Sequence, residues 1–125
     1  MKCDYLKLFG VALAILSSGS LFSQNPRLKA DLELFRVRCT QCHPIEMAKS
    51  ETGLIPSDIA DMIERMREQP GSLIQKNETG RLYQIALFRI YANQRADLEA
   101  ELKDLSPEQR KKEILALKKA LAPYK

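Results

Sequence analysis

The sequence predicts an all-α fold, with three short helices followed by a C-terminal helical extension, and three observations support this class. Apolar residues recur every three or four positions in several separate segments, which is the spacing of one helix face. Prolines and small polar residues stand where these segments begin, as they do at helix N-termini. With 125 residues, 45% of them apolar and 29% charged, the chain has the composition of one soluble domain with one core.

Residues 1–23 have the pattern of a secretory signal peptide. Lys2 and Lys7 flank a short N-terminal region, residues 8–16 form an uncharged apolar run, and small polar residues follow. The run is too short for a typical membrane span, so we expect cleavage after Ser23, or after Ser20, and export to the periplasm. An uncleaved membrane anchor is the alternative.

The first helix of the mature chain belongs to a predicted domain over residues 24–92. It begins at Asn25 and Pro26, an N-cap residue followed by proline at the first helical position. Apolar residues then follow at helical spacing, and the helix is expected to end at Cys39. Basic residues interleave with Asp31 and Glu33, which is typical of a solvated face.

Two further helices complete this predicted domain. One starts near residues 56–58 and ends at about Glu68, before Pro70, with an apolar stripe formed by Ile55, Ile59, Met62, Ile63 and Met66. The next begins at residues 76–78, and its expected inner side includes Leu82, Ile85 and Ala86. Gly80 either lies in the first turn of that helix or allows close approach to the first helix.

Residues 93–125 are predicted to be a helical extension packed on the domain or docking from it. Ser106, Pro107 and Gln109 form a capping box with proline at the first position. The helix that follows is amphipathic, with apolar residues on one face and four lysines on the other. It is interpreted either as a cover for apolar surface or as a docking element for a partner or a membrane.

Cys39, Cys42 and His43 stand in the sequence CTQCH, the C-x-x-C-H signature of covalent haem attachment. Two thiols at this spacing can reach two vinyl groups on one edge of a porphyrin, while the adjacent imidazole meets the iron. A zinc site would need a fourth ligand, and a thioredoxin-like dithiol would need a βαβ setting. A disulfide between Cys39 and Cys42 is the remaining alternative.

The second axial ligand has to come from something other than histidine, because His43 is the only histidine in the chain. Methionine, lysine, a weak amide ligand or an open position remain. Met47 is too near His43 to reach the opposite face of the ring. Met62 and Met66, one helical turn apart, are the candidates, unless both simply fill the core.

These residues resemble the small monohaem cytochromes c exported by bacteria. Phe35 matches the aromatic residue that class I cytochromes c place four residues before the first cysteine. Asp31 stands eight residues before that cysteine, where those proteins have a glycine. Residues 56–74 are similar to the pattern P-x-x-W-x-x-x-V-x-R-M followed by P-G-S-x-I, with Ile59 in place of tryptophan. The resemblance covers about residues 28–91. It implies a cytochrome c-like bundle of three short helices around one covalent haem, with Met66 as the distal ligand.

The resulting functional prediction is an extracytoplasmic electron-transfer protein, not an enzyme, with one haem c and redox proteins as partners. Removal of residues 1–23 lowers the formal charge from +4 to about +3, which is too small to predict a nucleic-acid partner. Membrane contact is expected only through an uncleaved leader or the C-terminal amphipathic helix. One alternative is a haem with an open distal site that acts as a gas or peroxide sensor or a small catalyst. Another is a haem-free interaction protein.

Overall fold

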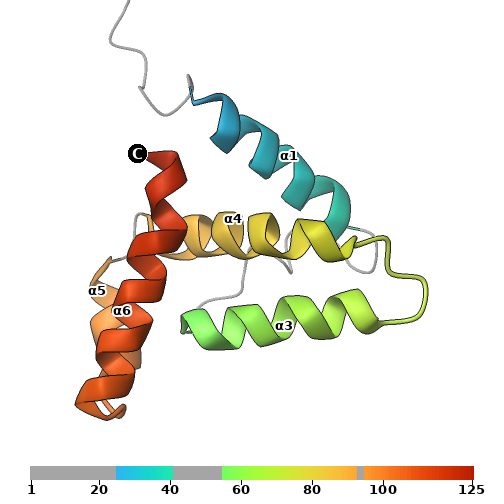
Figure 1. Cartoon of the computed structure of the whole chain (residues 1–125). Helices are drawn as coiled ribbons and strands as arrows, with labels where there is room; N and C mark the ends of the chain where they lie inside the picture. The colour runs from blue at the N-terminus through green and yellow to red at the C-terminus, as the bar shows by residue number, and fades with distance from the viewer. Residues whose placement is uncertain (1–24, 41–54, 93–94) are drawn as a thin grey trace, which may run out of the picture.

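The computed structural model describes residues 25–40, 55–92 and 95–125, and all regular secondary structure in these ranges is helical (Figure 1). The predicted all-α class is therefore confirmed for them. The predicted signal peptide lies outside the described residues. In chain order the elements are α1 (Pro26–Cys39), α3 (Pro56–Glu68), the 3-10 turn η2 (Lys76–Glu78), α4 (Thr79–Tyr91), α5 (Arg95–Leu102), α6 (Pro107–Leu121) and the 3-10 turn η3 (Ala122–Tyr124).

Local capping explains where α1 and α6 begin. The side-chain oxygen of Asn25 accepts a hydrogen bond from the amide of Leu28 at 3.1 Å. At α6 the Ser106 hydroxyl accepts from the Gln109 amide, and the Gln109 side chain accepts from the Ser106 amide, both at 3.2 Å. These side chains replace the acceptors that the first turn of a helix lacks. Both helix starts agree with the sequence prediction.

Helix α4 is central to the fold, because α1, α3, α5 and α6 all contact it (Figure 1). The predicted inner side of α4 is confirmed, since Leu82, Ile85 and Ala86 are buried. Leu87 and Tyr91 are buried as well. The apolar surface of α4 therefore extends around the helix, because neighbouring helices cover it from more than one side.

Helices α1 and α3 are held mainly by apolar packing on α4, which runs between them in Figure 1. Leu28 and Phe35 of α1 are buried, as are Ile59 and Ile63 of α3. Burial of a side chain of this size contributes about 1.5–3 kcal/mol. Helices α1 and α3, which carry Cys39 and the two candidate methionines, thus share one core with α4.

The C-terminal elements return to the same core. Helix α6 contacts α4 and α3, and η3 contacts α1. Leu117 and Ala120 on the inner face of α6 are buried. Tyr124 of η3 is 3% exposed and packs edge-on against Phe88, with ring centroids 5.1 Å apart. None of the described helices is both long and apolar enough to span a membrane.

Two glycines have different structural roles. Gly80 lies in the first turn of α4, and a Cβ added there would meet no atom within 4 Å, so the close approach to α1 considered above is wrong. Gly71 has a φ of +81°. It is the third residue of a turn in which the Ser72 amide donates to the Gln69 carbonyl at 3.0 Å. Proline second and glycine third are the residues that suit a type II turn.

Candidate haem-attachment site

Cys39 is the last residue of α1, so the helix delivers the first cysteine of CTQCH as predicted. Its side chain is half-buried and packs against the apolar core. Burial raises the pKa of the Cys39 thiol to about 11, although the positive charge of Arg89 acts in the opposite direction. In the haem-free chain this thiol is therefore neutral at physiological pH. The other predicted members of the motif, Cys42 and His43, lie outside the described residues.

The residue before Cys39 ties the end of α1 to the start of α4. The guanidinium of Arg38 donates two hydrogen bonds to the carboxylate of Glu78, from Nε at 2.9 Å and from Nη2 at 2.8 Å. These side chains are 23% and 16% exposed. The Arg38 guanidinium holds the pKa of Glu78 below its usual value. A bidentate pair fixes orientation as well as distance, so the backbone that carries Cys39 is held in place.

A second arginine, Arg89 in the last turn of α4, also lies near Cys39. The guanidinium of Arg89 is 4.7 Å from the centroid of the Phe35 ring, a distance at which a cation is attracted to an aromatic face. Phe35 is one turn before Cys39 on α1 and is buried. The aromatic residue that carries part of the sequence resemblance thus packs in the contact between α1 and α4.

The candidate distal ligands lie on α3. Met62 and Met66 are both half-buried, and both pack against the core that also receives Cys39. Met66 is in the last turn of α3, where its carbonyl accepts a hydrogen bond from the Gln69 amide at 3.3 Å. The two thioethers have equivalent surroundings by these measures, so the preference for Met66 depends on the sequence resemblance.

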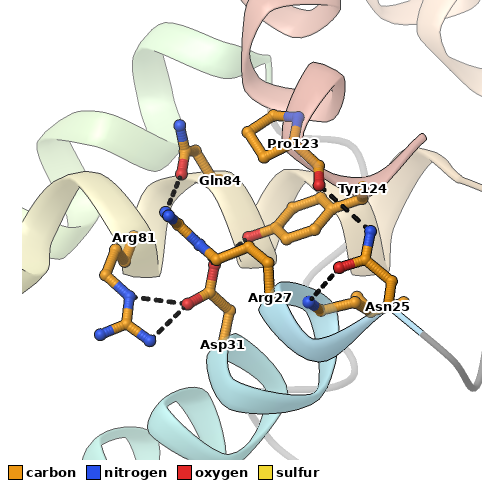
Figure 2. A network of polar contacts seen from close by, with 8 residues as sticks. Asn25, Arg27, Asp31, Arg81, Gln84, Pro123 and Tyr124 are labelled. Carbon is orange, nitrogen blue, oxygen red and sulfur yellow. Dashed lines mark hydrogen bonds and ion pairs between the residues drawn. The ribbon is translucent and has the colours of Figure 1, made fainter.

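Asp31 is the centre of a buried polar network (Figure 2). Its side chain is 0% exposed. The carboxylate accepts hydrogen bonds from Arg27 Nε at 2.6 Å, from Arg81 Nε at 2.6 Å and from the Tyr124 hydroxyl at 2.7 Å. Burial alone raises the pKa of Asp31, but the three donors outweigh it and hold the pKa below its ordinary value. The buried acid therefore stays ionised at neutral pH.

The network joins three elements that are distant in sequence. Arg27 of α1 also donates to the Gln84 side chain of α4 at 2.9 Å, and Asn25 donates to the Pro123 carbonyl of η3 at 3.2 Å (Figure 2). The assignment of Asp31 to a solvated face was wrong. Its position three residues after Leu28 and four before Phe35 places it on the buried face of α1, which is a signal that the sequence contained.

The described residues include one thiol and two thioethers, the donor types that a covalently attached haem would use. A thiol at a helix end suits a thioether bond, and thioethers on α3 suit soft axial ligation of iron. Cys39, Met62 and Met66 pack against one core rather than on separate surfaces. In residues 25–40, 55–92 and 95–125, no three His, Cys, Asp or Glu side chains gather into a metal-binding group.

Comparisons with protein-family models, with curated proteins and with solved structures find no match to this chain.

Proposed function

We propose that this chain is an extracytoplasmic electron-transfer protein that carries one covalently attached haem c. The observation that carries the proposal is that α1 ends at Cys39, the first cysteine of the C-x-x-C-H sequence. A helix end is a defined attachment point, and the Arg38–Glu78 pair limits its movement. The predicted leader agrees with this role, since thioether attachment is an extracytoplasmic maturation.

Each residue of the proposed site has a separate role. Cys39 and Cys42 would hold the haem through thioether bonds, and His43 and Met66 would ligate its iron, with Met62 in the core. When bound, the haem supplies a one-electron redox couple. The thioether of Met66 favours ferrous iron and so raises the reduction potential relative to a second histidine.

The surface left to a redox partner is basic along α6. Its apolar side packs against α4 and α3, so this side is not free to enter a membrane. The outward side carries exposed lysines around Leu115, which is 51% exposed. These lysines are Lys111, Lys112, Lys118 and Lys119. Such a face suits a partner with an acidic surface.

The proposal is tested by absorption spectra of the exported protein, in the ferric and ferrous states, before and after addition of carbon monoxide. A low-spin haem that stays attached after denaturation, with a weak long-wavelength sulfur-to-iron band and no response to carbon monoxide, is the expected result. A high-spin ferrous haem that binds carbon monoxide readily would instead support the sensor or catalyst. A colourless protein, made with the maturation machinery present, would exclude both.

A further inference from the structure

Helix α3 begins without a cap of its own. Its N-cap residue, Ile55, provides no side-chain hydrogen bond, and Pro56 at the first position has no N–H group. The amide of Ser57 is therefore the first N–H of the helix in need of an acceptor. This acceptor comes from Glu113, 56 residues later in α6, whose Oε2 lies 3.0 Å from the Ser57 nitrogen.

Among the acids that the structure describes, Glu113 is unusual because it is buried without a cation. It is 7% exposed and forms no ion pair with any residue of the described ranges. A buried carboxylate without a counterion is costly unless it is hydrogen-bonded. The Ser57 amide and the partial positive charge at the start of α3 provide that compensation.

This contact restricts a movement that apolar packing does not. Ile59 and Ile63 hold α3 against α4 through side-to-side contacts, which tolerate sliding along the helix axis more readily than a directional hydrogen bond does. A hydrogen bond at the first turn fixes the axial position of α3. Met66 lies nine residues further along the same helix, about 13 Å from Ser57 at the rise of an α-helix.

The axial position matters because Met62 and Met66 are one turn apart. A shift of α3 by about half a turn, roughly 2.7 Å, would therefore leave neither sulfur at the position of the distal ligand. We infer that Glu113 is a positioning residue, which caps α3 from α6 and thereby holds the ligating methionine of α3 at the distal position of the haem. This inference depends on the proposed function insofar as a methionine of α3 ligates the iron.

Two substitutions separate the hydrogen bond from the packing. Glu113→Leu removes the acceptor but keeps an apolar side chain of similar size in a buried position, so the chain is expected to fold. Glu113→Gln keeps an acceptor oxygen and serves as the conservative rescue. Lys112→Ala, at an exposed neighbouring position on α6, is the control.

The first readout is hydrogen exchange at the Ser57 amide, which requires no haem. Exchange in Glu113→Leu is expected to be at least about tenfold faster than in the original chain, because a hydrogen bond to a charged acceptor is lost. Glu113→Gln is expected to retain much of the protection. Lys112→Ala is expected to exchange at the original rate.

The second readout is the ligand state of the haem. Glu113→Leu is expected to lose much of the sulfur-to-iron band and to bind carbon monoxide in the ferrous state, whereas Glu113→Gln and Lys112→Ala keep the original spectrum. A folded Glu113→Leu protein with unchanged Ser57 exchange, or with an unchanged band and no carbon monoxide binding, would overturn the inference. If the original chain itself lacks a haem with methionine ligation, the proposed function fails instead, and the spectra distinguish the two results.

Discussion

The hydroxyl of Tyr124 donates a hydrogen bond to the carboxylate of Asp31 at 2.7 Å and so joins the last helical turn to the first helix across 93 positions of the chain. Both residues are buried, at 3% and 0% exposed. Phe88 packs against the Tyr124 ring from α4. The contact therefore has a polar part and an apolar part, which can be separated by substitution.

Replacement of Tyr124 by phenylalanine removes the hydroxyl and leaves the ring in place. Because Asp31 keeps both arginine partners, we expect the free energy of unfolding to fall by about 1.5–3 kcal/mol, the contribution of a hydrogen bond to a charged group. Urea denaturation followed by circular dichroism measures this difference. Tyr83→Phe is the matched control, since Tyr83 is a half-buried tyrosine of α4 that is not among the residues bonded to Asp31. An equal loss in both variants would contradict the role of Tyr124.

Because Asp31 is ionised and hydrogen-bonded in the folded chain, we expect the protein to become less stable at acidic pH. Its pKa is lowered in the folded state, so its contribution is fully present above the ordinary carboxyl pKa of 3.8. That contribution is lost as the pH falls through the lower pKa of the folded chain. Asp31→Asn is expected to cost about 3–5 kcal/mol at neutral pH, because Arg27, Arg81 and Tyr124 lose their shared charged acceptor.

The difference between the original chain and Asp31→Asn isolates this group from other acids, such as Glu33 and Glu78, whose pKa values are also lowered. We expect the difference in unfolding free energy to shrink steadily as the pH is lowered below 4. A difference that stays constant down to pH 2 would show that the ionisation of Asp31 does not contribute.

The helix boundaries could be predicted because their signals are local. Asn25 and Ser106 cap the helices that follow them, and the turn at Pro70 and Gly71 comes directly after the end of α3. The arrangement of helices around α4 could not be predicted in the same way. The burial of Leu87 and Tyr91 depends on neighbours that cover α4 from other directions, and one amphipathic stripe does not report them.

The polar contacts around the site were beyond prediction for a related reason. Arg38 and Glu78 are 40 positions apart, and Glu113 and Ser57 are 56 positions apart, so neither pair forms a local pattern. The position of Cys39 at the end of α1 could be predicted, because a motif and a helix period meet there. The helix period does not separate Met62 from Met66, since both residues lie on the same stripe, and the prediction of Met66 depends on the resemblance alone.

Substitution by alanine is expected to have opposite effects on stability at Gly71 and at Gly80. Gly71→Ala places a Cβ at a φ of +81°, a conformation that costs other residues about 1 kcal/mol or more. Gly80→Ala meets no atom within 4 Å and lies in a helical turn, so a gain of up to about 1 kcal/mol is expected. Thermal unfolding of the two variants should therefore shift in opposite directions. Shifts of the same sign would contradict either the turn or the helix assignment.

Burial of Cys39 predicts slow alkylation in the folded, haem-free chain. With a pKa of about 11 rather than the ordinary 9.0, the thiolate fraction at pH 8 is lower by about 100-fold. We expect iodoacetamide to react correspondingly slowly with Cys39 in a chain whose Cys3 and Cys42 are replaced by alanine. Circular dichroism verifies that this chain is helical. The rate should rise about tenfold per pH unit below pH 11, and urea should remove the protection. Fast reaction in the helical chain would contradict the burial.

Met66→Ala and Met62→Ala form the pair that tests the ligand assignment. Both side chains are half-buried on α3, so their losses of packing are expected to be similar. Only Met66→Ala should abolish the sulfur-to-iron band, lower the reduction potential and allow carbon monoxide to bind ferrous iron, because a soft thioether ligand is removed. Absorption spectra and a redox titration of both variants provide the measurement. If Met62→Ala loses the band and Met66→Ala keeps it, the ligand is Met62. If both keep it, neither methionine of α3 is the ligand.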